Sequence, residues 1–372
     1  MRRTLILPLV LTLFGGSSAV QAADPFLSPP GVAGAGTGGA MVAGPGSLAS
    51  VWHNPATLVD GDTEFVFEWQ TAADRTRGGR LSRGANSWFA GASFVNRDKW
   101  YGTVATGIAA YTPHTQKYWT AEVGEGNSAF GRTNVTTQAI GIPYAVEFDR
   151  IGLALGAVGE LIAVDASGTE IRVKDSAGEI SEADVDDDQN IGFSGALGIR
   201  YIFYEEGPVR VDVAGVRRAR ASDGASIDVD SGTAARLAPD KPAGWDAGLR
   251  WRYDMGEQRS IAIKMHYGST HWDDAGKMRR DGFGFTFRRP FGDTTALRSG
   301  MMSLRAGYSR FRPDEAKPWM DWPRGRALSA GIGFDFDQSL TLDVFLERRK
   351  EERNQFRDQH KTFGGVSIGI PF

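Results

Sequence analysis

Apolar and polar residues alternate with a period of two along most of this chain, and no other feature constrains the fold as strongly. In the last ten residues, Val366, Ile368, Ile370 and Phe372 alternate with glycine and serine. Successive side chains of a β-strand point to opposite sides, so the pattern predicts a strand with one apolar face and one small or polar face.

Fourteen segments of this kind are predicted, an even number, as bacterial outer-membrane barrels have. Each is close to the roughly 9–11 residues with which a tilted strand crosses a bilayer. The predicted strands are 63–71, 86–96, 100–111, 136–148, 150–165, 190–204, 207–216, 243–254, 258–269, 281–289, 300–311, 325–337, 339–350 and 361–372.

The connections between these segments alternate in length. "NRDK", "DR", "EEG", "MGEQ" and "DQ" are tight, whereas long polar stretches lie near 112–135, 166–189, 217–242 and 311–324. Short turns at one end and long loops at the other are typical of a transmembrane barrel. A soluble array of short strands is the alternative. Closing the sheet pairs every strand edge, which lipid would otherwise leave unpaired. We therefore predict an all-β, transmembrane antiparallel β-barrel of about 14 strands over residues 61–372.

The N-terminus has the features of a secretory signal peptide. Arg2 and Arg3 precede an apolar run from Leu5 to Phe14, and Ala22 ends a stretch of small residues. The run is too short for a membrane-spanning helix, so we predict that residues 1–22 are a signal peptide. We expect the protein in the outer membrane of a Gram-negative-type cell, in contact with its lipid. The aromatic C-terminus, Phe372, is expected to guide the last strand to the barrel assembly machinery.

Composition excludes several classes of site. The chain has no cysteine, which excludes disulfides, a lipoprotein anchor and thiolate metal sites. Without the signal peptide, which contains two arginines and no acid, 42 − 2 = 40 basic residues face 45 acidic ones, so the net charge is −5. A mildly acidic chain lacks the basic surface that nucleic acid requires, and we expect no nucleic-acid partner.

A Gly/Ala-rich segment separates the signal peptide from the first strand. Gly34, Gly36 and Gly39 have the spacing of a dinucleotide-binding loop. That loop follows a buried strand and opens a helix, whereas here Pro29-Pro30 precedes the glycines and Pro45-Gly46 interrupts the stretch. Small residues let one backbone approach another closely. We therefore predict that residues 23–60 form a plug, or hatch, inside the barrel lumen.

The end of this segment, "SVWHNPATL", together with the C-terminal third, resembles the FadL-type outer-membrane transport family for long-chain fatty acids and aromatic hydrocarbons. "SLRAGYSRF" and "ALSAGIGFDFDQSLTLDVFLERRK" have the order and spacing of that family's last strands. The resemblance implies a fourteen-stranded barrel with an N-terminal hatch that carries an Asn-Pro-Ala motif, here Asn54, Pro55 and Ala56. It also implies passive uptake of a hydrophobic small-molecule ligand.

Two roles remain open for Asn54-Pro55-Ala56. Proline restricts its own backbone and that of the preceding residue, and an asparagine amide can cap nearby backbone groups. The turn could therefore only anchor the plug, or it could also take part in gating.

Four cations on the predicted inner face are candidates for binding a ligand carboxylate: Arg250, Arg252, Lys264 and Arg305. The alternative is that they belong to ion-pair networks within the lumen. The acids expected in such networks are Asp246, Asp335, Asp343 and Glu347.

Other functions find less support in the sequence. A non-transporting barrel that serves a secretion or conjugation system is the alternative function, although no docking motif is visible. The histidines needed for serine activation lie in no nucleophile motif: His53, His114, His266, His271 and His360. We expect no catalytic residues and no cofactor.

One acidic stretch has the oxygen spacing of a hard-cation site, Asp184-x-Asp186-x-Asp188-x-Asn190. It lacks the glycine and glutamate of a calcium loop and is interpreted as a solvated external loop. We therefore expect no metal site, with weak divalent-ion bridging to anionic lipid as the alternative for this loop.

Overall fold

The computed structural model describes residues 31–44, 46–75, 81–123, 127–174, 180–183, 188–221, 227–229, 233–235, 243–272, 276–292, 300–316, 324–336, 339–352 and 359–372. The predicted signal peptide lies outside these residues. Within them, no helix is long and apolar enough to cross a bilayer.

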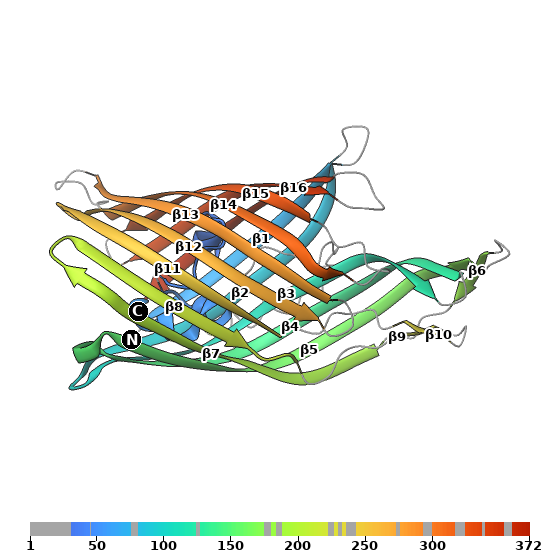
Figure 1. Ribbon diagram of the computed structural model, residues 1–372, viewed down its shortest axis with the longest axis horizontal. Coiled ribbons are helices and arrows are strands. Elements are labelled where there is room, and N and C mark those ends of the chain that lie inside the picture. Colours follow the sequence, from blue (N-terminus) through green and yellow to red (C-terminus); the bar gives the residue numbers. More distant parts are fainter. Residues whose placement is uncertain are drawn as a thin grey trace, which may run out of the picture.

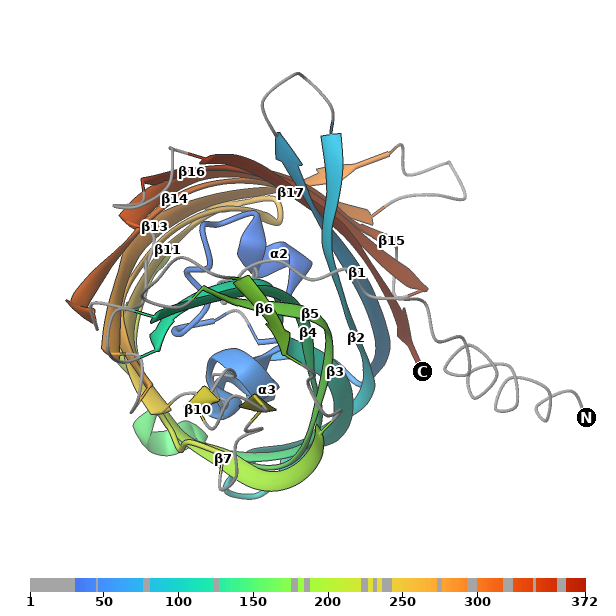
Figure 2. The same ribbon diagram turned by 90° about the vertical axis from the view of Figure 1, so that its right-hand side faces the viewer.

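Fourteen antiparallel strands form one closed ring (Figures 1 and 2). Each strand pairs with its neighbours in the sequence, β1 pairs with β17, and the pairing of β4 with β5 completes the ring. The ring strands are β1 Glu64–Arg75, β2 Leu81–Lys99, β3 Gly102–Val123, β4 Asn127–Phe148, β5 Leu153–Lys174, β7 Asp188–Glu206, β8 Val209–Arg218, β11 Ala243–Gly256, β12 Arg259–Trp272, β13 Gly276–Phe291, β14 Gly300–Ala316, β15 Arg324–Phe336, β16 Leu340–Glu352 and β17 Gln359–Pro371. The predicted barrel is thus confirmed, and each predicted strand overlaps one of these.

Three short strands lie outside the ring, at the right in Figure 1. β6 (Ile180–Ala183) pairs antiparallel with the end of β5, and β9 (Ile227–Val229) pairs with β10 (Thr233–Ala235).

Two of the predicted long loops are largely strand, and this part of the prediction is wrong. β3 and β4 remain paired through most of 112–135, as far as the partners Val123 and Asn127. β5 continues to Lys174 and β7 starts at Asp188, so strand also covers the ends of 166–189. Backbone pairing does not itself require apolar alternation, which is the mark of a strand with one face in lipid. These polar stretches therefore do not show the pattern from which the strands were predicted.

The connections between strands differ in length at the two ends of the ring, as predicted. β7–β8 and β11–β12 turn tightly at the left of Figure 1. Glu257 and Gln258 both have positive φ, 49° and 59°, as the two central residues of a type I′ turn require. Tight turns of this kind mark one rim, and we refer to it as the short-turn end.

Side chains on the ring follow the predicted alternation. On β12, Ile263 and Met265 are 37% and 54% exposed on the outside, whereas Lys264 and His266 are 3% and 6% exposed on the inside. At the C-terminus, the ring of Phe372 lies 4.7 Å from that of Phe65, centroid to centroid. The apolar face is thus outside the barrel, where a bilayer contacts it, and the polar face lines the lumen.

Candidate functional site in the barrel lumen

Residues 31–61 lie inside the ring of strands, and we call them the lumenal segment (Figure 2). The segment contains two short α-helices, α2 (Val32–Ala35) and α3 (Ser50–His53), followed by the 3₁₀-helix η1 (Pro55–Asp60). Nearly all of its described residues are buried. α2 ends at Gly36, α3 at Asn54 before Pro55, and η1 at Gly61, so each is short and the segment follows the wall of the barrel instead of forming a separate core.

Glycines in the wall make this close packing possible. A Cβ atom placed on Gly198 of β7 would lie 1.9 Å from Asn54 Oδ1, and one on Gly156 of β5 would lie 2.3 Å from the amide nitrogen of Ala56. On the opposite wall, a Cβ on Gly307 of β14 would lie 2.1 Å from the amide nitrogen of Gly38. Any side chain at these three positions would clash with the lumenal segment. Glycine within a strand often marks such an approach of another backbone.

Asn54 connects three parts of the molecule. Its Nδ2 donates hydrogen bonds to the carbonyl oxygens of Val42, at 2.9 Å, and Ile199, at 3.1 Å. Its Oδ1 accepts a hydrogen bond of 3.1 Å from the amide of Ala56, which caps η1. The buried amide thus joins both halves of the lumenal segment to β7. Pro55 sits at the first position of η1, where its missing N–H costs no hydrogen bond.

Polar contacts also attach the segment to the wall at α2 and at α3. The carboxylate of Glu68 on β1 accepts hydrogen bonds from the amides of Gly31, at 2.7 Å, and Val32, at 3.3 Å. Arg218 on β8 donates to the carbonyl oxygens of Trp52 and His53, at 2.9 and 2.8 Å. These contacts satisfy backbone groups that the short helices α2 and α3 leave unpaired.

A buried ionic cluster lies at the end of the segment. Arg200 on β7 is fully buried and pairs with Asp60 of η1 at 3.1 Å, with Glu147 on β4, and with Asp212 on β8 at 3.6 Å. Asp212 also binds Arg250 on β11, at 2.7 Å. Charges contributed by β4, β7, β8 and β11 thus converge on the C-terminal end of the lumenal segment.

The four predicted cations have different surroundings. Arg250 is paired with Asp212, and Arg305 is paired with Asp343. Arg252 lies near the short-turn end, half exposed, and is paired with Asp254. Lys264 is buried and forms no ion pair with any described residue; its Nζ lies 4.0 Å from Met41 Sδ of the lumenal segment.

The predicted acidic partners mostly pair elsewhere. Asp343 pairs with Arg305, as expected. The other three bind arginines that were not among the candidates: Asp246 with Arg218, Asp335 with Arg288, and Glu347 with Arg349.

Sequence reasoning missed the residues that hold the segment: Glu68, Asp60, Arg200, Asp212 and Arg218. Asp212 carried a usable signal, because it is the lone acid in "VRVDVAGV", where the only other charged residue is Arg210. Nothing local distinguishes the others from ordinary lumenal charges.

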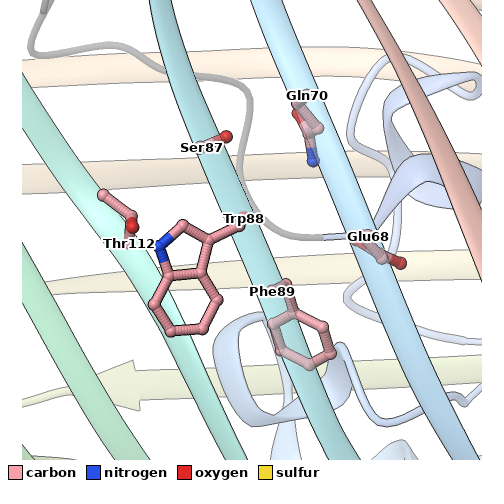
Figure 3. Close-up of a pocket in the computed structure, with 6 residues that line it drawn as sticks. All are labelled: Glu68, Gln70, Ser87, Trp88, Phe89 and Thr112. Atoms are coloured by element: carbon pink, nitrogen blue, oxygen red, sulfur yellow. The ribbon is translucent and has the colours of Figure 1, made fainter. Parts of the chain in front are cut away.

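A narrow recess lies beside the start of the lumenal segment (Figure 3). Its empty volume is about 170 Å³, part of it open to solvent. Four polar side chains and two aromatic ones line it: Glu68 and Gln70 on β1, Ser87, Trp88 and Phe89 on β2, and Thr112 on β3. Glu68 therefore contacts both the recess and the first residues of the segment.

The described residues contain no group of three or more His, Asp and Glu side chains arranged to hold a metal ion. The predicted external loop with the Asp184-x-Asp186-x-Asp188-x-Asn190 spacing lies partly outside the described residues, and its metal-binding alternative stays untested.

The fold and the lumen define a class: a fourteen-stranded antiparallel barrel whose interior contains its own N-terminal segment. No protein-family model matches the sequence, and the curated proteins contain no match to it. Solved structures do match over most of the chain. The Pseudomonas putida toluene transporter TodX has a TM-score of 0.57 at 16% identity, covering 95% of this chain and 100% of TodX.

Two further solved structures share this fold. A Pseudomonas aeruginosa FadL homologue has a TM-score of 0.60 at 11% identity, covering 94% of this chain and 100% of its own. The CymD monoaromatic hydrocarbon channel has a TM-score of 0.57 at 13% identity, covering 92% and 97%. The chain therefore has the fold of FadL-type transporters, and the resemblance drawn from the sequence is confirmed at the level of the fold.

Proposed function

We propose that the protein is a passive outer-membrane uptake channel for hydrophobic small molecules, with the lumenal segment as its plug. The observation that carries this proposal is the close fit between that segment and the glycines of the wall, at Gly156, Gly198 and Gly307. A lumen occupied in this way is unsuited to free diffusion of polar solutes. The shared fold supports the same function, since two of the matched structures are described as a toluene transporter and a hydrocarbon channel.

An apolar solute needs such a route. Moving apolar surface into water costs about 25 cal/mol per Å², so a water-filled pore offers a hydrocarbon little advantage. A plugged barrel can pass the ligand from a binding site to a path that opens when the plug shifts. The segment packs on the wall through three separate apolar clusters, and individual polar contacts such as those of Glu68 and Arg218 supplement them. Because the clusters are separate, one part of the segment can shift while the others stay in place.

We infer the ligand class, fatty acid or aromatic hydrocarbon, from the charges inside the lumen. Lys264 is the one predicted cation without a carboxylate among the described residues, and its ammonium group lies 4.0 Å from Met41 Sδ of the plug. We infer that a ligand carboxylate pairs with Lys264 when the plug segment moves away, which favours fatty acids.

A disulfide tether tests the need for plug movement. A Cβ on Gly141 of β4 would lie 2.7 Å from Cγ2 of Val51 in α3. A cysteine sulfur at position 51 can occupy the place of that methyl group, next to the Cβ of a cysteine at position 141, as a disulfide requires, and the natural chain contains no cysteine to interfere. The double variant Val51→Cys/Gly141→Cys is reconstituted in liposomes, and uptake of oleate and toluene is measured with and without reductant.

We expect oxidation to stop uptake by the double variant and reduction to restore it, while each single variant transports in both conditions. Swelling assays with a sugar serve as the control for a polar pore. If the wild type neither binds nor transports oleate or toluene, the uptake function is wrong, and a barrel that serves an envelope assembly becomes the better explanation. Unchanged uptake by the oxidised double variant would show instead that ligands pass without movement of this part of the plug.

A further inference from the structure

Basic side chains gather on the outer face of β14–β16, directly beyond the lipid-facing apolar band. On β15, Leu328 is 65% exposed, and the next outward residue along the strand is Arg326. On β16, Leu346 is 60% exposed, and the next outward residue is Arg348. We call the group that follows the apolar band the basic strip; it consists of Arg310, Arg312, Arg324, Arg326, Arg348 and Lys350.

Strand register sets like charges side by side within this strip. Arg326 is directly opposite Arg310 on β14 and directly opposite Lys350 on β16. All three side chains point outward. Like charges at directly opposite positions of a sheet destabilise it, so the arrangement has a cost unless an anion lies between them.

Protein carboxylates neutralise only part of the strip. Arg310 pairs with Asp281 at 3.2 Å, and Lys350 pairs with Glu352 at 2.9 Å. The remaining four cations form no ion pair with any described residue: Arg312, Arg324, Arg326 and Arg348. The strip therefore has an excess of positive charge on a surface that also contacts the membrane.

The strip lies toward the rim opposite the short-turn end. β14 and β15 are joined beyond it by 317–323, and β16 and β17 by 353–358, whereas β15 and β16 are joined at the far rim by 337–339. Short turns of such barrels face the periplasm, so the strip is level with the outer leaflet. The outer leaflet of a Gram-negative-type outer membrane consists of phosphorylated glycolipid.

We propose that the basic strip is a binding site for the phosphate groups of this outer-leaflet glycolipid. Guanidinium groups bind phosphate oxygens through paired hydrogen bonds, and clusters of basic side chains bind anionic headgroups at a membrane surface. A phosphate between Arg326 and its two basic neighbours removes the repulsion between them, while the acyl chains cover Leu328 and Leu346. The site lies on the outside of the barrel and is independent of the uptake function.

Binding to two forms of the lipid tests the site. The full-length protein in detergent is titrated with diphosphoryl lipid A and with its dephosphorylated form, which has the same acyl chains. We expect the wild type to bind the diphosphoryl form about tenfold more tightly or better, as one or two charge-assisted hydrogen bonds imply. The variant Arg324→Gln/Arg326→Gln/Arg348→Gln should lose that preference. Arg289→Gln, on the outer face of β13 near the short-turn end, should keep it.

Thermal unfolding provides a second readout that does not depend on affinity. Without lipid, Arg326→Gln should unfold at the same temperature as the wild type or a higher one, because repulsion from Arg310 and Lys350 is relieved. In the presence of diphosphoryl lipid A, the unfolding temperature of the wild type should rise by more than that of the variant.

Equal binding of both lipid forms by the wild type overturns the proposal, as does an unaltered preference for the diphosphoryl form in the triple variant. If inorganic phosphate alone stabilises the wild type as well as the lipid does, the strip is a general anion site and not a glycolipid site.

Discussion

The side chain of Asn54 occupies the space where a side chain at Gly198 would otherwise be. A Cβ on Gly198 would lie 1.9 Å from Asn54 Oδ1 and 3.0 Å from the ring of Pro55. Asn54 in the lumenal segment and a glycine 144 residues further along the chain are thus complementary parts of one contact. The position of the lumenal segment depends on both.

Gly198→Ala should destabilise the protein, because its methyl group cannot be accommodated unless the Asn54 turn moves. Overpacking of this kind costs about 1–3 kcal/mol, and thermal unfolding in detergent measures it. Gly159→Ala on β5 is the matched control, since a Cβ there meets nothing within 4 Å. Equal unfolding temperatures for the two variants would contradict the close contact.

We expect the hydrogen bonds that Asn54 donates to contribute more to stability than the one that it accepts. Asn54→Ala leaves the carbonyls of Val42 and Ile199 without this partner in a buried position, at a cost of about 1–3 kcal/mol for each unsatisfied group. Asn54→Asp keeps the acceptor for Ala56 but sets a carboxylate against those two carbonyls. We expect the stability order wild type, Asn54→Ala, Asn54→Asp. An aspartate variant as stable as the wild type would show that the donor is unimportant.

Removing Arg200 should strongly destabilise the end of the plug. Arg200→Met leaves the carboxylates of Asp60, Glu147 and Asp212 without their shared cation, and breaking a buried ion pair costs about 3–5 kcal/mol. Arg259→Met removes an exposed pair with Glu257 in the β11–β12 turn and should cost at most about 1 kcal/mol. Thermal unfolding compares the two variants. Ion conductance in planar bilayers reports whether the plug is loosened, which we expect for Arg200→Met alone.

The variant Lys264→Met should weaken the binding of a charged ligand and leave the binding of a neutral ligand unchanged. If Lys264 pairs with the ligand carboxylate, the variant should bind oleate less tightly, by about tenfold or more, and should bind toluene as the wild type does. Lys361→Met is the control, because Lys361 is a buried cation that already pairs with Glu351 at 2.9 Å. Both variants need to be folded, as judged by thermal unfolding. Unchanged oleate binding by Lys264→Met would rule out this role while leaving uptake itself untouched.

Much of the fold could be predicted from the sequence, because the physical requirement behind it is local. A strand between lipid and lumen must alternate apolar and polar residues, and Ile263, Lys264 and Met265 do so visibly. The lengths of tight turns such as 257–258 are equally local. The extension of β3 and β4 through 112–135 was missed, because these residues pair through their backbones without such alternation in the sequence.

The lumen was predictable only in part. The sequence by itself determined that the wall strands form a barrel with apolar residues outside, and that the N-terminal glycines could not form a core of their own. Only the tertiary structure decided which charges meet. Arg200, Asp60 and Asp212 come from three elements, and whether an inward cation is neutralised depends on how the closed ring and the lumenal segment bring such elements together. Alternation specifies the face on which a side chain lies, but ion pairing and close packing depend on distances of a few ångströms between residues far apart in the chain.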